Sequence, residues 1–198
     1  MKRNFLSKIF SRIPTLETEH LLFRSVKRSD LKDINSYASN PKTSQYLLWE
    51  PHKTLQYTQE FIELVLSRYK SGEYSDWALV HKESGRMIGT CGFTRVDEEN
   101  SIVEIGYVLN PEFWGMGLAT EAATKIVDFA FNVLQANRVE AKFMFGNDAS
   151  LAVMKKIGMK FEGYQRDALF VKGKFRTIGT ASILKREYEL NKKYAEFE

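Results

Sequence analysis

Two glycines, Gly115 and Gly117, lie two residues apart between a hydrophobic segment and an amphipathic one. The segment before them, Ile102 to Leu109, has the character of a buried strand, and the segment after them carries apolar residues at helical spacing. Glycine adopts backbone angles closed to other residues, so this joint can turn sharply and no side chain projects from it. The free N–H groups of the helix's first turn then face outward, with the positive end of the helix dipole behind them. We therefore favour a phosphate-binding turn over an ordinary strand-to-helix connection.

The helix predicted after the glycines has one apolar face, small at its start and larger further on. That face consists of Ala119, Ala122, Ala123, Ile126, Val127, Ala130, Val133 and Leu134. Small residues let the phosphate-binding end approach the sheet closely. The motif is not a Walker loop, because no Gly-Lys-Ser/Thr follows. It is a poor dinucleotide fingerprint, since the third glycine is missing and no acidic residue closes the next predicted strand, Arg138 to Phe145.

The stretch from Phe113 to Ala122 resembles the acetyl-CoA pyrophosphate loop of the GNAT superfamily of N-acetyltransferases. It is most similar to the branch that contains the ribosomal-protein N-terminal alanine acetyltransferases. The usual pattern is Gln/Arg-x-x-Gly-x-Gly/Ala, and Trp114 stands where Gln or Arg is usual, which that branch commonly tolerates. The resemblance runs from about Thr15 to about Leu184. Its further matches, in the expected order, are Thr18 to Arg24, Glu104 to Tyr107, and Asn147 to Ser150.

The resemblance implies a GNAT fold, which is an α/β (α+β) architecture. Its mixed, mostly antiparallel twisted sheet has a splayed central strand pair and flanking helices. It also implies that acetyl-CoA is the cosubstrate and that backbone groups in the splay bind its pantetheine arm, one N–H near Val108 or Leu109 receiving the thioester oxygen. The residues implied to bind the coenzyme are Tyr107, Val108, Leu109, Trp114, Gly115, Met116, Gly117, Leu118, Ala119, Thr120, Asn147 and Ser150.

Glu104 is our candidate base, because it is the only carboxylate within the hydrophobic strand that leads to the glycines. Burial without a neighbouring cation would raise the pKa of such a carboxylate. The alternative is a charge on a solvated strand face. An α-amine needs little help from a base, because its pKa is about 8, whereas that of lysine is about 10.4.

Ser150 is our candidate acid for the departing thiolate. In many GNAT members a tyrosine on the late helix has this role, but the matching position here is Met154, which cannot donate a proton. Ser150 instead occupies the position at which, in the ribosomal-protein branch, a serine is assigned the role of acid. The alternative is a first-turn serine that bonds to backbone. Asn147 likewise is expected to cap that helix, to contact the pantetheine, or both.

The composition of the 198 residues is typical of one globular domain, with 43% hydrophobic and 27% charged residues. The net charge of +4 favours an anionic ligand, and no nucleic-acid recognition motif is present. Cys91 is the only cysteine and the three histidines are dispersed, which excludes an intrachain disulfide and gives no metal-ligand spacing. A cytoplasmic location fits, and no apolar run is long enough to cross a bilayer.

The chain divides into an N-terminal amphipathic extension (1–14), an acetyltransferase domain (15–186) and a charged C-terminal tail (187–198). The extension carries Phe5, Leu6, Ile9, Phe10 and Ile13 on one helical face. We favour a terminal helix docked on its own domain or a partner subunit over a membrane-surface helix. Predicted helices cover Asp30 to Ala38, capped by Ser29, Leu55 to Lys70, and Ala149 to Ile157. The other predicted strands are Leu21 to Ser25, Trp77 to His81, Met87 to Val96, Lys160 to Tyr164, Gln165 to Val171 and Phe175 to Leu184.

The sequence therefore predicts an acetyl-CoA-dependent N-acetyltransferase in which an amine attacks the thioester directly. A protein N-terminal α-amine is the expected acceptor. The alternatives are a small amine, polyamine or antibiotic acceptor, or a non-catalytic acyl-CoA-binding regulator on the same fold. Contact with membranes is not expected, and both a monomer and a homodimer are compatible with the sequence.

Overall fold

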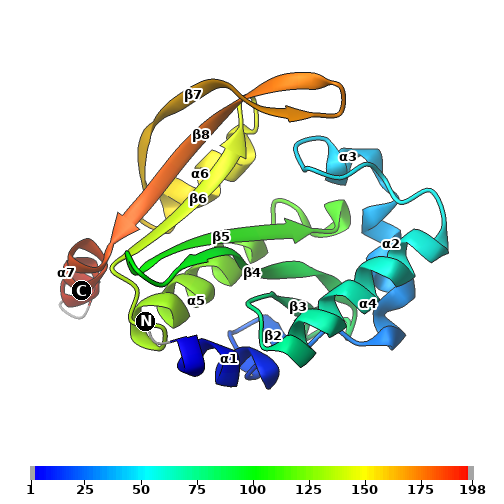
Figure 1. The fold of residues 1–198 in the computed structure, drawn as a ribbon, viewed down its shortest axis with the longest axis horizontal. Helices are drawn as coiled ribbons and strands as arrows, with labels where there is room; N and C mark the ends of the chain where they lie inside the picture. The colour runs from blue at the N-terminus through cyan, green and yellow to red at the C-terminus, as the bar shows by residue number, and fades with distance from the viewer. Residues whose placement is uncertain (1–2, 196–198) are drawn as a thin grey trace.

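The computed structural model describes residues 3–195, which form one eight-stranded sheet flanked by helices (Figure 1). The strand order is β1-β2-β3-β4-β5-β6-β8-β7. The strands are β1 (Leu16–Glu17), β2 (Leu21–Arg24), β3 (Asp76–His81), β4 (Met87–Asp97), β5 (Ile102–Leu109), β6 (Arg138–Met144), β7 (Lys160–Val171) and β8 (Lys174–Leu184). The helices are α1 (Arg3–Ser11), α2 (Leu31–Ala38), α3 (Pro41–Ser44), α4 (Leu55–Ser71), α5 (Leu118–Asn132), α6 (Asp148–Lys156) and α7 (Lys185–Ala195).

Neighbouring strands pair antiparallel, with the exception of β5 and β6, which are parallel. A parallel pair needs a long crossover, and α5 supplies it between these two strands. The mostly antiparallel, mixed sheet expected from the sequence is confirmed. None of the described helices is both long and apolar enough to cross a lipid bilayer.

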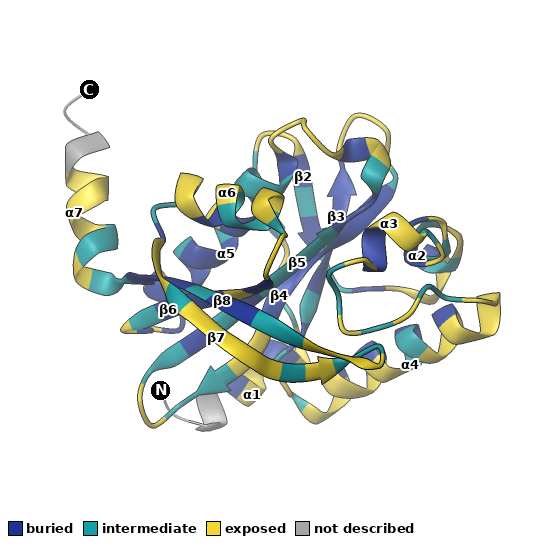
Figure 2. Cartoon of the chain, turned by 90° about the horizontal axis from the view of Figure 1, so that it is seen from above, coloured by how far each residue is buried: buried dark blue, intermediate teal, exposed yellow. Residues whose placement is uncertain are grey.

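Side chains on the two faces of the sheet belong to two separate apolar cores. Strand β3 shows the division, since Trp77 and Leu79 pack into the core that contains α5 residues, while Ala78 and Val80 pack toward α2 and α4. This alternation follows from the two-residue period of a strand. Figure 2 shows β3 and β4 mostly buried at the centre, whereas the edge strand β7 and the outer turns of α4 and α6 are exposed.

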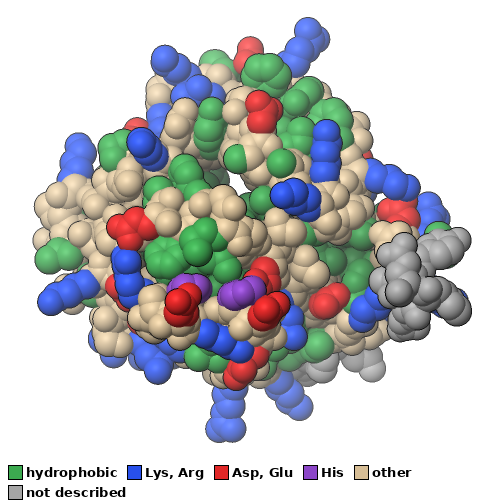
Figure 3. All heavy atoms as spheres, turned by 180° about the vertical axis from the view of Figure 1, so that it is seen from behind, with side chains coloured by type: hydrophobic (Ala, Val, Ile, Leu, Met, Phe, Trp, Pro, Cys, Tyr) green, Lys and Arg blue, Asp and Glu red, His purple; other side chains and the backbone are tan. Residues whose placement is uncertain are grey.

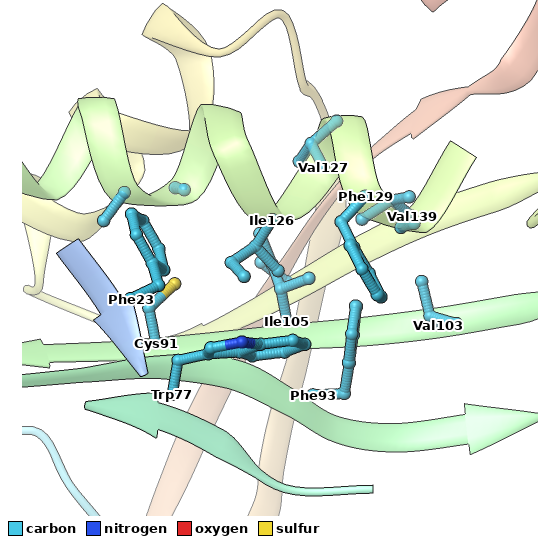
Figure 4. Close-up of a cluster of buried hydrophobic side chains, with 14 of the residues drawn as sticks. Phe23, Trp77, Cys91, Phe93, Val103, Ile105, Ile126, Val127, Phe129 and Val139 are labelled. Atoms are coloured by element: carbon cyan, nitrogen blue, oxygen red, sulfur yellow. The ribbon is translucent and has the colours of Figure 1, made fainter. Parts of the chain in front are cut away.

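The larger core is built from aromatic rings on the sheet and the apolar face of α5 (Figure 4). The Trp77 ring meets Phe129 edge-on at 5.3 Å and Phe93 at 5.9 Å between ring centroids. Each fully buried ring or branched side chain contributes about 1.5–3 kcal/mol relative to exposure. The alanines predicted to face the sheet, Ala122 and Ala123, are fully buried, so α5 lies close to the strands.

Helix α1 docks on this domain, because Leu6 and Phe10 are buried in the larger core. Phe10 packs edge-on against Trp77 at 6.0 Å. This is the arrangement expected of a terminal helix rather than of a membrane-surface one. The predicted contribution of the Phe5 side chain lies outside the described residues.

Three local predictions differ from the structure. Ser29 does not cap the first helix; a 3₁₀ turn (Arg28–Asp30) precedes α2, and Asp30 accepts from the Lys27 N–H at 2.8 Å. The segments on either side of Gln165 form one strand, β7, with register shifts in its pairing to β8. The predicted charged tail (187–198) is helical as far as it is described: α7 runs from Lys185 to Ala195, and Tyr188 stacks on Phe131 at 4.7 Å and donates a hydrogen bond to Asp128.

Candidate active site

Strands β5 and β6 form a fork. They pair at three positions only, Ile102 with Arg138, Val103 with Val139 and Glu104 with Glu140. Beyond these pairs β5 continues to Leu109 and β6 to Met144, each pairing only with the strand on its outer side. The expected splay is thus present, and Figure 1 shows the two strands diverging. Backbone N–H and C=O groups on the inner edges of the fork are available to a ligand, since such groups rarely remain unpaired.

The glycine loop follows the open end of β5. Gly115 has φ +78° and Gly117 has φ +81°, so both adopt the left-handed conformation that glycine permits at low cost. Gly117 is the N-terminal cap of α5 and no side chain caps the helix there. The first intrahelical contact is made by the Glu121 N–H to the Gly117 carbonyl at 3.0 Å. The amides before Glu121, in Leu118, Ala119 and Thr120, have no carbonyl within the helix to bind.

The position of Trp114 is explained by the strand that it follows. Its indole N–H donates to the Leu109 carbonyl at 2.9 Å and so fixes the end of β5, while half of its surface stays exposed. Met116 between the glycines is also exposed. Space beside the two glycines is open, because a Cβ at either one would meet no atom within 4 Å.

A recess of about 570 Å³ adjoins the start of α5. It is lined by Thr18, Gly117, Thr120, Glu121, Thr124, Lys125, Asp128 and Lys156. Two lysines, one from α5 and one from α6, place positive charge beside the free helix amides. The carboxylates of Glu121 and Asp128 line the same recess and balance these lysines, so the free amides and the helix dipole are what suits a phosphate group here.

Glu121 ties the first turn of α5 to the loop before β2. Its two carboxylate oxygens lie 2.9 Å from the backbone N and from Nδ1 of His20. The hydrogen bond with Glu121 raises the pKa of His20, while its small burial opposes this. Burial alone would raise the pKa of Glu121, but the hydrogen bonds from Thr18 and His20 outweigh it and lower that pKa. Sequence reasoning missed this pair because its members are 101 residues apart.

Glu104 lies at the last paired position of the fork. Its carboxylate accepts from Lys142 Nζ at 2.6 Å and from Thr94 Oγ1 at 2.8 Å, and its side chain is 16% exposed. The condition of burial without a cation is therefore not met. Lys142 and Thr94 were not among the predicted site residues. The alternation of β6, in which Lys142 lies between inward-facing Ala141 and Phe143, was the available signal.

Ser150, in the first turn of α6, meets Tyr107 of β5. The Tyr107 hydroxyl lies 3.0 Å from Ser150 Oγ and 3.1 Å from the Ser150 carbonyl oxygen. The Asn147 side chain accepts from the Ser150 N–H at 3.2 Å, so its role as the cap of α6 is confirmed. The Ser150 hydroxyl contacts a side chain, which differs from the alternative of a serine bonded to backbone alone. Burial raises the pKa of Tyr107 to about 12, against the hydrogen bond with Ser150, which lowers it.

Other reactive side chains lie outside this arrangement. Cys91 is fully buried in the larger core, and burial raises its thiol pKa well above the ordinary value (Figure 4). Met154 is buried in the same core. His81 is buried against Phe113, with ring centroids 5.2 Å apart. Within the described part of the chain, no cluster of three His, Cys, Asp or Glu side chains could hold a metal ion.

The tip of the β7–β8 hairpin crosses to α3 and closes the outer side of the site. Lys172 Nζ donates to the Ser44 carbonyl at 2.6 Å, a contact between residues 128 positions apart. At the end of β6, a Cβ on Gly146 would lie 3.6 Å from the Tyr46 hydroxyl, so the segment after α3 also approaches there. We call the Lys172–Ser44 contact the clasp. Figure 1 shows the hairpin reaching toward α3, and Figure 3 shows the molecule hollowed near its centre when viewed from behind.

Comparison with known proteins agrees with this geometry. Residues 20–160 match the family model described as "Acetyltransferase (GNAT) domain". The chain is 34% identical over 174 residues to "Uncharacterized N-acetyltransferase p20" of Bacillus licheniformis, covering 88% of this chain and 98% of that protein. It is 39% identical over 105 residues to "Putative ribosomal N-acetyltransferase YdaF" of Bacillus subtilis (strain 168), covering 53% of this chain and 57% of that protein.

Solved structures share the fold. A GNAT-family acetyltransferase from Bacillus anthracis superposes with a TM-score of 0.78 at 24% identity, covering 87% of this chain and 99% of that one. Spermidine N-acetyltransferase from Vibrio cholerae, in complex with CoA and spermine, has a TM-score of 0.74 at 19% identity, covering 87% of this chain and 99% of that one. The family match spans more than half of the sequence and the p20 relative spans nearly all of it, so this chain belongs to the GNAT family of N-acetyltransferases.

Proposed function

We propose that this N-acetyltransferase transfers the acetyl group of acetyl-CoA to the N-terminal α-amine of a protein, by direct attack of the amine on the thioester. The observation that carries the proposal is the fork between β5 and β6 with the glycine loop at its open end. The fork offers unpaired backbone groups to the pantetheine amides, and the loop offers helix amides to the pyrophosphate.

In this proposal the coenzyme extends along the open part of β5. The pyrophosphate lies on the amides from Gly115 to Thr120, with Lys125 and Lys156 contributing charge from the recess. Tyr107 contributes backbone groups to the pantetheine arm, and Leu109 contributes its N–H because its carbonyl already accepts from Trp114. The backbone groups of Val108 face β4 instead, since the Asn110 N–H donates to the Ile88 carbonyl and the pairing alternates from there. A coenzyme held in this way brings its thioester between the arms of the fork, near Ser150 and Glu104.

Charge beside the clasp supports an α-amine over a polyamine. Helix α3 contributes Lys42 and the hairpin tip contributes Lys172 and Lys174, while neither segment carries a carboxylate. A polyamine carries several positive charges, which these lysines would repel. A peptide presents a single amine of pKa about 8, partly neutral at pH 7. The local likeness to YdaF points the same way, whereas spermidine N(1)-acetyltransferase of Escherichia coli (strain K12) is 24% identical over 166 residues.

The test is release of free CoA thiol from acetyl-CoA in the presence of separate amines. The panel contains a peptide with a free N-terminus and no lysine, the same peptide with a blocked N-terminus and one lysine, spermidine, and no amine. We expect the fastest release with the free N-terminus. Fastest release with spermidine would show that the acceptor is a polyamine and not an α-amine. Tight acetyl-CoA binding with no thiol release for any amine would favour a non-catalytic regulator.

A further inference from the structure

The hydroxyl of Tyr107 has no role in the transfer described so far, although it lies against the candidate acid. Tyr107 is on β5 and Ser150 is in the first turn of α6, so their contact joins one arm of the fork to the helix that follows the other arm. The phenol group is largely buried, and its two described polar neighbours are the hydroxyl and the carbonyl of Ser150, at 3.0 Å and 3.1 Å.

The direction of these hydrogen bonds decides whether Ser150 can act as an acid. A carbonyl oxygen only accepts, whereas each hydroxyl carries one proton and can also accept. If Tyr107 donates to the Ser150 carbonyl, Ser150 can donate its own proton to Tyr107 and then has none for another group. If Tyr107 instead donates to Ser150 Oγ, the serine proton is free to point into the fork. Both hydrogen-bond arrangements fit the same two oxygen–oxygen distances, and rotation of the Tyr107 O–H about its C–O bond converts one arrangement into the other.

We propose that Tyr107 is the source of the proton that Ser150 delivers to the departing thiolate, an inference that rests on the proposed function. As the C–S bond breaks, the Ser150 proton moves to the CoA sulfur and the Tyr107 proton moves to Ser150 Oγ. The products of the step are the CoA thiol, an intact serine and a tyrosinate. The amine nitrogen gives one proton to Glu104, the candidate base, which passes it to water, and the tyrosinate regains one from water, so the net reaction is amine plus acetyl-CoA giving amide plus CoA.

The acidity of the two hydroxyls supports this order. A serine hydroxyl is a weaker acid than a phenol, so serine acting alone would be left as a strongly basic alkoxide. Burial raises the pKa of the Tyr107 phenol to about 12, which still leaves it a stronger acid than an alcohol, and the phenol oxygen lies 3.0 Å from Ser150 Oγ. Tyr107 acts through Ser150 and does not itself have to reach the sulfur.

The variant Tyr107→Phe keeps the ring and removes the proton. We expect kcat to fall by about 10-fold or more, the effect of losing acid assistance, with KM for acetyl-CoA changed less than about twofold. Ser150→Ala should lower kcat by roughly 10²-fold with coenzyme affinity retained. Because both residues act in one step, the double variant should be no slower than Ser150→Ala.

Tyr69→Phe is the matched control. Tyr69 is also a largely buried tyrosine, and its hydroxyl donates to a backbone carbonyl, that of Asp76 at 2.6 Å, but it lies in the core of α2 and α4. The readout is single-turnover rate against the deuterium fraction of the solvent. Two protons moving together give a curved plot for wild type and Tyr69→Phe, and one proton gives a straight line for Tyr107→Phe.

Each outcome decides the proposal. An unchanged rate for Tyr107→Phe would overturn it, as would a slower rate with the curvature retained, because the tyrosine would then only hold α6 in place. If this variant does not fold, 3,5-difluorotyrosine at position 107 keeps the shape and lowers the phenol pKa; an unchanged rate and an unchanged curve would then overturn the proposal. Wild-type protein that releases no CoA with any amine would overturn the proposed function and this inference together, whereas an active wild type with an unaffected Tyr107→Phe overturns this inference alone.

Discussion

At the scale of single residues, Gly117 has the most specific requirement. Its φ of +81° is accessible to glycine and costs other residues about 1–3 kcal/mol, although space for a side chain is present. A side chain there would project beside the amides that start α5. In the free protein, the backbone conformation of Gly117 therefore makes any side chain there costly. In the proposed complex with acetyl-CoA, a side chain there would also obstruct the phosphate.

We predict that Gly117→Val abolishes acetyl-CoA binding while the fold is kept. Gly85→Val is a matched control, because Gly85 has φ +67° and equally open space but lies in the turn between β3 and β4. Both variants should lose similar stability in denaturant unfolding, about 1–3 kcal/mol. In calorimetry only Gly117→Val should lose binding, and binding equal to wild type would contradict the assignment of the loop.

His20 gives a prediction that depends on pH. The Glu121 hydrogen bond raises its pKa above the ordinary 6.5, so the folded state binds the proton more tightly than the unfolded state. The stabilisation is therefore fully present below pH 6.5 and disappears as pH rises through the raised pKa. An NMR titration of the His20 ring should show the raised value in wild type and a lower one in Glu121→Gln. Equal values in the two proteins would show that the pair does not form in solution.

At the scale of elements, the Glu104–Lys142 contact joins β5 and β6 near the point where the two strands separate. This pair is partly exposed, so it contributes no more than about 1 kcal/mol to stability. A role in the transfer would instead appear in the rate. The two roles can thus be separated by comparing stability and kinetics in one variant.

We predict that Glu104→Gln lowers kcat/KM more for a lysine-like acceptor than for an α-amine, because the α-amine is already partly neutral at pH 7. In wild type, log kcat/KM should rise with pH until base and acceptor are both deprotonated. Lys142→Met is the comparison, since it breaks the same ion pair and keeps the carboxylate. Small, equal losses for both acceptors in Glu104→Gln would leave Glu104 as a surface charge.

The clasp gives a prediction about the acceptor side. Lys172→Met removes the bond to the Ser44 carbonyl, so amides of α3 should exchange hydrogen faster. KM for the peptide should change while KM for acetyl-CoA does not, because neither Lys172 nor Ser44 lines the recess at the start of α5. Lys174→Met, two residues away on the exposed tip, should leave both unchanged. Equal exchange in the two variants would show that the clasp is not formed in solution.

Much of this arrangement could be predicted from local sequence. Strand and helix periodicity places Ile102 to Leu109, the glycines and most of the apolar face of α5 correctly, because each signal comes from residues close together in the chain. Val133 is the exception on that face, since it lies just past the end of α5 and is 38% exposed. Asn147 was likewise identified as a cap from its position before a short apolar helix. These features depend on backbone geometry that a few neighbouring residues determine.

The contacts that shape the chemistry could not be predicted in the same way. His20 with Glu121, Glu104 with Lys142, Tyr107 with Ser150, and Lys172 with Ser44 join residues 38 to 128 positions apart. Each contact depends on how the sheet is ordered and where its strands diverge. Tyr107 shows the consequence, since its backbone was assigned to the coenzyme while its hydroxyl received no role.

At the scale of the whole molecule, different elements flank the two arms of the fork. Helix α5 and its glycine loop follow one arm of the fork, and α3 with the β7–β8 hairpin closes over the other. The sheet between them is held by aromatic packing from β3, β4 and α5, so the arms can diverge without loss of the core. A coenzyme and an acceptor approaching from different sides would meet at Ser150 and Tyr107.

The most direct test of this account is mass spectrometry of one peptide that carries both a free N-terminal α-amine and a lysine. The peptide is incubated with the protein and acetyl-CoA, with spermidine present in equal concentration. The account predicts one acetyl group, located on the N-terminus, and one free CoA thiol for each acetylated peptide. Acetylation of spermidine with an unmodified peptide, or no thiol release at all, would contradict it.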